Sequence, residues 1–160
     1  MEVRSLAGAL LVGALAGSGC GGPPDMPVAP EPVRLRVSAP ADSVLAVARR
    51  VVLRADWQLA DGDVAPGTLV AERTAPFDNN REWIRCPEGY RWGGPGLPRS
   101  TVRLQVSATE RDGQTAVGIE MRSASAVVFD PIWRDMTRIR CVSSGRMERM
   151  VAEALAERFP

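Results

Sequence analysis

The sequence predicts an α+β fold in which an antiparallel sheet of three to five strands has two helices packed on one face. Three observations support this prediction. Apolar and polar residues alternate in several short segments, two longer segments carry apolar residues at helical spacing, and an Asp-Gly pair joins two alternating segments into a hairpin. The expected order is strand, helix, three or four strands, helix (β-α-β-β-β-α), and one buried sheet face accounts for the alternation.

The first predicted strand is residues 33–37 (VRLRV), whose two arginines face solvent. Apolar residues then recur at helical spacing over residues 44–55, which predicts the first helix. Ser38 or Asp42 is expected to cap this helix, and Pro40 suits its first turn.

Further strands are predicted in the middle of the chain. A turn containing Asp61 and Asp63 precedes an expected strand at 67–73 (GTLVAER), and residues 83–86 (WIRC) form a short strand fragment. Residues 87–98 are rich in glycine and proline and predict a long loop.

The clearest hairpin joins residues 101–107 (TVRLQVS) to residues 116–121 (AVGIEM). Its connection contains Asp112-Gly113, a pair typical of tight reversals. Residues 126–129 (AVVF) form a weaker extended segment.

The second helix is predicted from Ser143 or Ser144 to the end of the chain. Its apolar stripe comprises Met147, Met150, Val151, Ala154, Leu155 and Phe159. Arg146, Glu148, Arg149, Glu153 and Glu157 are assigned to its polar side, and a serine followed by Glu148 suits a capped amino terminus.

The amino terminus has the layout of a secretory signal. Arg4 precedes an apolar stretch at 6–16, which is too short to span a bilayer, and small residues follow up to Gly19. We therefore expect a signal peptide at 1–19. Residues 20–32, rich in proline and glycine, form a tether, and one domain covers 33–160.

The residues Leu15-Ala16-Gly17-Ser18-Gly19-Cys20 resemble a bacterial lipoprotein lipobox. This resemblance implies that Cys20 is diacylated, becomes the mature amino terminus and anchors the protein to a membrane. Gly21 is not the aspartate that retains lipoproteins at the inner membrane, so the outer membrane, facing the periplasm, is expected. The alternative is that Cys20 is an unpaired cysteine behind an ordinary signal peptide.

Composition narrows the function classes. The formal net charge is +1, so no global field attracts nucleic acid, and no nucleic-acid partner is expected. Histidine is absent, which removes the commonest general base and metal ligand. All 20 basic residues are arginine, which fits either a GC-rich bacterial genome or selection for bidentate anion contacts. No catalytic residue, metal site or cofactor is expected.

Cys86 and Cys141 are the two cysteines outside the signal region, and in an exported protein they predict a disulfide. The alternative, a redox or metal pair, would need CxxC spacing or further ligands, which the sequence lacks.

Candidate partner-binding residues fall into two groups. Arg34, Arg36, Arg103 and Arg122 lie on predicted strands, where they form either a cationic binding patch or an ordinary solvated face balanced by Glu72 and Glu120. Aromatic residues beside charges form the second group, Tyr90, Trp92 and Trp133, which are either recognition residues or loop anchors. Asp61 and Asp63 supply only two carboxylates, and a calcium loop needs several more oxygen ligands, so these residues are expected to form an ordinary turn.

The order of elements is similar to the helix-grip domains of the C component of the outer-membrane β-barrel assembly machinery, and the resemblance covers Val33 to Phe159. It implies a non-catalytic role, as a binding or scaffold module for a periplasmic or outer-membrane protein partner. The alternative is an envelope enzyme that acts on glycan or phosphoryl substrates with Asp, Glu and Arg side chains alone.

Overall fold

A computed structural model describes residues 26–60, 65–87, 99–130 and 135–160 and confirms the α+β class. The elements, in chain order, are β1 (Val33–Val37), α1 (Ala41–Arg54), β2 (Gln58–Leu59), β3 (Thr68–Pro76), α2 (Phe77–Asn80), β4 (Ile84–Arg85), β5 (Arg99–Arg111), β6 (Gln114–Asp130), β7 (Asp135–Arg140), β8 (Val142–Ser143) and α3 (Arg146–Arg158).

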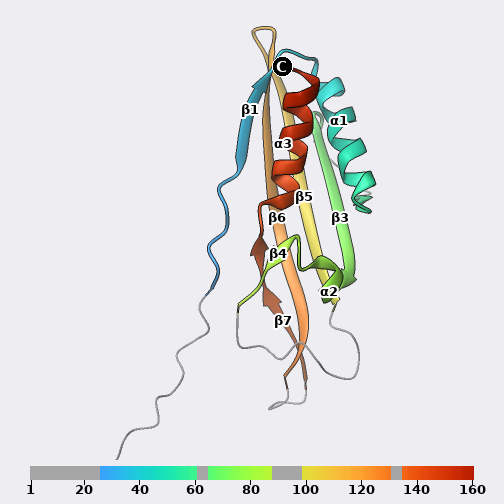
Figure 1. Cartoon of the computed structure of the whole chain (residues 1–160), viewed down its shortest axis with the longest axis vertical. Coiled ribbons are helices and arrows are strands. Elements are labelled where there is room, and N and C mark those ends of the chain that lie inside the picture. The colour runs from blue at the N-terminus through green and yellow to red at the C-terminus, as the bar shows by residue number, and fades with distance from the viewer. Residues whose placement is uncertain (1–25, 61–64, 88–98, 131–134) are drawn as a thin grey trace, which may run out of the picture.

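The main sheet is antiparallel and has six strands, one more than the upper end of the predicted range. Its order is β1-β6-β5-β3-β2, and β7 also pairs with β6. β1 pairs with residues 115–119 of β6 and β7 pairs with residues 125–130, so the two strands follow one another along the same edge of β6. Figure 1 shows this long strand running the length of the sheet, with β1 beside one part and β7 beside the other.

Both long helices lie on one face of the sheet and contact each other, as the sequence predicts (Figure 1). The helix α1 packs on β5, whose inward residues Val102, Leu104 and Val106 are fully buried, and α3 packs on β1 and β6. Trp57 and Trp83 complete the core with an edge-on ring contact, their centroids 5.9 Å apart. The hydrophobic core is therefore a single layer between helices and sheet.

The predicted helix caps are wrong in detail. α1 begins after Pro40 with no side-chain cap, so neither Ser38 nor Asp42 fills that role. The N-cap of α3 is Gly145, whose φ of 78° lies in the left-handed region that suits glycine. Ser144 and Ser143 lie one and two residues before this N-cap. Their hydroxyls accept hydrogen bonds from the backbone N–H groups of Arg146 and Gly145, respectively.

Glu148 differs from its predicted place on the polar side of the last helix. It is buried, with 3% of its surface exposed. The reason is helical geometry, since Glu148 shares a face with the buried residues Val151 and Leu155 at i+3 and i+7. The capping hydrogen bond expected of Glu148 is not formed.

The hairpin is confirmed and is longer than predicted, because β5 and β6 extend to residues 99 and 130. Asp112 and Gly113 both have positive φ, at 51° and 76°, as a two-residue hairpin turn requires. β7 and the short helix α2 are not predicted from the sequence. The expected turn at Asp61 and Asp63 and most of the 87–98 loop lie outside the described residues.

Cys86 and Cys141 form the predicted disulfide, with their Cα atoms 4.3 Å apart. Cys86 directly follows β4 and Cys141 directly precedes β8. These two strands pair with each other, with Ile84 opposite Ser143. The small β4–β8 sheet is thus covalently closed. Within the described part of the chain, no helix is long and apolar enough to cross a membrane.

Candidate functional site

The face of the sheet opposite the helices carries a concentration of arginine, which we call the arginine face. Strand alternation places eight exposed arginines on it: Arg34, Arg36, Arg99, Arg103, Arg111, Arg122, Arg138 and Arg140. The four arginines predicted to share the solvent side of the sheet are among them. The described helices contact the opposite face, so this one is open to solvent or to a partner.

Carboxylates do not balance this charge. On the same face of the described strands, only Glu72 and Glu120 are acidic. Glu120 forms an ion pair of 3.1 Å with Arg122, both partners being partly exposed. Glu72 lies opposite Arg103 in the β3–β5 register without forming an ion pair. The arginine face therefore keeps a clear cationic excess in spite of the chain's near-zero net charge.

A β-bulge contains one of these arginines. Arg103 pairs with Ser123 and the next residue, Leu104, pairs with Met121, so Arg122 is an extra residue on β6. Its Nε donates a hydrogen bond of 2.9 Å to Gln105 Oε1. Arg122 stays on the open face with Gly118 and Glu120, where the hydrogen bond to Gln105 and the ion pair with Glu120 hold it, and the bulge brings Ser123 to the same face.

The arginine face also contains a shallow groove of about 590 Å³. Arg34 and Arg36 line one side of it, and the floor is built from Ala116 and Gly118. A Cβ at position 118 would come within 2.8 Å of Ser107 Oγ, so glycine keeps the floor low. The groove combines cationic side chains with exposed small residues, a surface that suits an inserted anionic segment.

The remaining predicted site residues are not placed by the structure. Cys20, Tyr90, Trp92 and Trp133 lie outside the described residues. The two described tryptophans, at 57 and 83, are both core residues.

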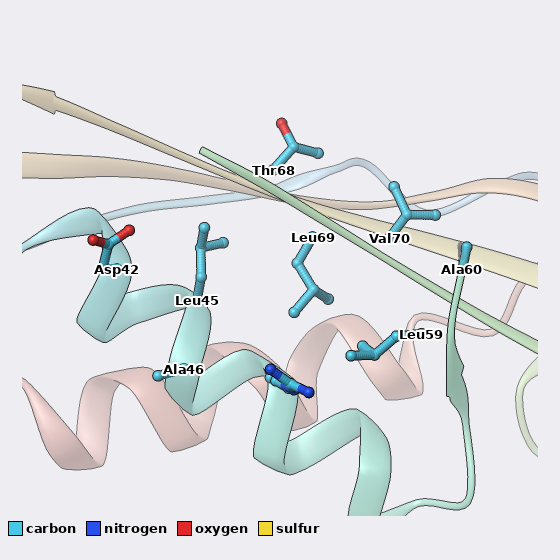
Figure 2. Close-up of a pocket in the computed structure, with 9 residues that line it drawn as sticks. Asp42, Leu45, Ala46, Leu59, Ala60, Thr68, Leu69 and Val70 are labelled. Atoms are coloured by element: carbon cyan, nitrogen blue, oxygen red, sulfur yellow. The ribbon is translucent and has the colours of Figure 1, made fainter. Parts of the chain in front are cut away.

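A second hollow, of about 370 Å³, lies between α1 and the strands β2 and β3 (Figure 2). Its walls are largely apolar, with Leu45, Leu59 and Leu69 turned toward one another. Among the described lining residues only Asp42 is acidic, and no described group of three or more His, Cys, Asp or Glu side chains could hold a metal ion. This hollow offers space and apolar contact without an evident acid–base pair.

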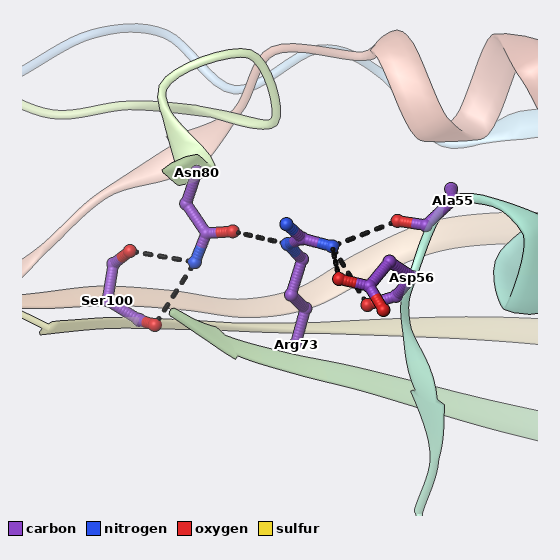
Figure 3. A network of polar contacts seen from close by, with 5 residues as sticks. All are labelled: Ala55, Asp56, Arg73, Asn80 and Ser100. Carbon is purple, nitrogen blue, oxygen red and sulfur yellow. Dashed lines mark hydrogen bonds and ion pairs between the residues drawn. The ribbon is translucent and has the colours of Figure 1, made fainter. Parts of the chain in front are cut away.

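Arg73 shows that not every strand arginine faces solvent. It pairs in register with the buried Val102 and therefore points to the helix side (Figure 3). Its guanidinium donates to the carbonyls of Ala55 and Asp56 at the end of α1 and to Asn80 Oδ1, at 2.8 to 3.0 Å. Arg73 is a structural residue and does not belong to the candidate site.

No protein-family model matches the chain, and no curated protein matches it. Among solved structures, the adenylate sensor of AMP-activated protein kinase in complex with ZMP aligns at a TM-score of 0.42 and 13% identity, covering 78% of this chain and 94% of that one. A DUF4468 family protein from Bacteroides ovatus aligns at 0.35 and 14%, covering 69% and 58%. Similarities of this size carry no argument about the function of this chain.

Proposed function

We propose that this protein is an exported, lipid-anchored and non-catalytic component of the bacterial cell envelope that binds an acidic surface of a periplasmic or outer-membrane protein. The observation that carries the proposal is the arginine face. On this side of the sheet, which the described helices leave open, eight exposed arginines outnumber two carboxylates. Electrostatic complementarity of this kind steers association and selects partners.

One feature of the sequence and one of the structure support an exported location. The first 20 residues resemble a secretory signal ending in a lipobox. The disulfide between Cys86 and Cys141 is of the kind that persists in oxidising compartments such as the periplasm. Lipidation of Cys20, with the outer membrane as destination, is part of the proposal.

A protein partner is favoured over the lipid surface by the shape of the arginine face. The groove between Arg34, Arg36 and the Gly118 floor is concave, and it can receive a protruding acidic segment. A plane of lipid headgroups would contact the rim arginines and leave this groove unfilled.

Replacing Arg34, Arg36, Arg103 and Arg122 together by glutamine is expected to weaken the interaction strongly. The measurement is affinity capture from detergent-solubilised membranes, followed by titration with the purified partner. We expect affinity to fall about tenfold or more, and the wild-type affinity to fall with added salt, because partly exposed charge pairs are screened.

The matched control replaces four exposed arginines on the helices, Arg49, Arg50, Arg54 and Arg158, by glutamine. It removes the same charge and is expected to leave the affinity unchanged. Equal loss in both variants would mean that net charge alone drives binding. Binding of the unlipidated domain to anionic vesicles, with no protein partner retained, would overturn the choice of a protein surface.

The anchor is tested separately with Cys20→Ser. We expect the wild-type protein to sediment with the outer-membrane fraction and to carry acyl chains detectable by mass spectrometry, whereas Cys20→Ser is released as a soluble periplasmic protein. Two or three acyl chains hold a protein firmly, since each buried methylene contributes about 0.8 kcal/mol. An unchanged membrane fraction for Cys20→Ser, together with an unmodified wild-type mass, would contradict the lipoprotein assignment.

A further inference from the structure

The tether does not continue β1 along the edge of β6. The antiparallel register of β1, extended backwards, would place Pro30 and Pro32 opposite residues 120–123. Proline has no N–H to donate to a sheet, so the ladder ends at Val33. β7 pairs with β6 only from Ser125 onward, and the edge between the two strands is left open.

A cavity of about 280 Å³ lies in this gap, and we call it the tether cavity. The lining residues used in the argument below are Pro30, Pro32, Glu120, Arg122, Arg140 and Glu148. Tether, sheet edge and α3 thus all contribute to its wall.

Glu148 is the unusual member of this wall. It is 3% exposed, and its Oε2 has no hydrogen-bond partner. It forms no ion pair with any residue that the structure describes. A buried carboxylate oxygen without a partner is unfavourable, so an occupant that supplies a positive group with N–H donors to Oε2 would remove this penalty.

The outer part of the cavity has the opposite character. Arg122 is paired with Glu120 at 3.1 Å, so these two charges offset each other. Arg140 is exposed and forms no ion pair within the described part of the chain. The cavity therefore offers one unpaired negative group, buried, and one unpaired positive group, exposed.

We propose that the tether cavity binds an amino-acid zwitterion, with the ammonium group on Glu148 and the carboxylate toward Arg140. The volume of about 280 Å³ lies just below the range of about 300 to 1,000 Å³ for drug-sized ligands, which fits a ligand as small as an amino acid. The cavity adjoins the arginine face, since Arg122 and Arg140 belong to both, whereas Glu148 lies on the helix side of the sheet and belongs to the cavity alone.

A metal ion is a poorer occupant. Of the two carboxylates in the wall, Glu120 is already paired with Arg122, and the described residues contain no group of three His, Cys, Asp or Glu ligands. Hard cations need more oxygen ligands than Glu148 alone provides.

The test is a titration of the ¹⁵N-labelled protein followed by amide chemical shifts. The probes are L-alanine, L-alaninamide, which lacks the carboxylate, and N-acetyl-L-alanine, which lacks the ammonium group. We expect saturable shifts with L-alanine at residues 120–124 and 146–149, and binding at least tenfold weaker for both analogues. Nε-acetyl-L-lysine, which carries the same zwitterion on a long arm, distinguishes a free amino acid from an amino-acid group on a larger molecule.

Three variants locate the binding groups. Glu148→Gln is expected to weaken L-alanine binding at least tenfold, and Arg140→Gln several-fold. Arg138→Gln, two residues away on the same face of β7 and outside the cavity wall, is the matched control and should bind as the wild type does. Without ligand, Glu148→Gln should have a Tm equal to or above that of the wild type, because it removes an unpaired buried charge.

Three results would overturn the proposal. The first is the absence of saturable shifts with L-alanine. The second is equal binding of L-alaninamide and L-alanine, which would leave Arg140 without a role. A lowered Tm of unliganded Glu148→Gln would show that the carboxylate stabilises the fold, and would also contradict it.

Discussion

Reduction of the Cys86–Cys141 disulfide will lower the free energy of unfolding by about 4 kcal/mol, the chain-entropy value for a cross-link spanning 55 residues. The closed loop contains β5 and β6, the two longest strands of the sheet. Cutting the cross-link therefore increases the entropy of a large part of the unfolded chain. It also frees the β4–β8 sheet, which has only two residues in each strand.

The measurement is urea unfolding of Cys20→Ser protein with and without a reducing agent. This background leaves only the two cysteines of interest. The control is the double variant Cys86→Ala and Cys141→Ala, whose stability should match the reduced protein and should not respond to reductant. Unfolding midpoints that agree between oxidised and reduced protein would contradict the prediction.

The elements with strong periodicity were predictable. The stripe from Met147 to Leu155 defines α3, because a helical period of 3.6 residues concentrates those side chains on one side. The hairpin was equally clear, since Asp112-Gly113 is one of the few residue pairs that tolerate positive φ at both positions. Local chemistry is sufficient in these two cases.

The rest depends on contacts that a sequence pattern does not contain. Residues 121–126, in the middle of β6, read MRSASA, and their small side chains give little alternation to detect. The strand β7 forms because it pairs with residues 125–130 of β6, with Ile139 buried opposite Ala126. Tertiary pairing, not intrinsic preference, defines both.

The candidate site was predictable in part for the same reason. Arg34, Arg36 and Arg103 sit in alternating segments, so their shared face follows from the period of two. Arg122 follows from the same alternation, but the bulge after it, which brings Ser123 and Ser125 to that face, is not visible in the sequence. For Glu148, the i+3 and i+7 relation to Val151 and Leu155 was a usable signal, but a charged residue at that spacing is usually assigned to solvent.

Replacing Arg73 by methionine is expected to destabilise the fold by about 2 to 4 kcal/mol, the range for removing one partner from a buried charged network. The Arg73 side chain is 14% exposed, and its Nε is the donor to Asn80 Oδ1. Asn80 is fully buried and donates in turn to Ser100, so its Oδ1 would lose the 3.0 Å hydrogen bond from Arg73. The carbonyls of Ala55 and Asp56, which follow α1, would lose a donor as well.

The control is Asp56→Asn, because the Asp56 side chain is 94% exposed and its 3.1 Å ion pair with Arg73 is screened by water. We expect this substitution to change the free energy of unfolding by less than about 1 kcal/mol. Asparagine tolerates the backbone φ of 63° at this position, so no backbone strain is added. Arg73→Lys keeps the charge without the planar fork, so it cannot serve Asn80 and the helix end together and should fall between wild type and Arg73→Met. If Arg73→Met and Asp56→Asn were equally stable in urea, the ion pair and not the buried network would be the stabilising contact of Arg73.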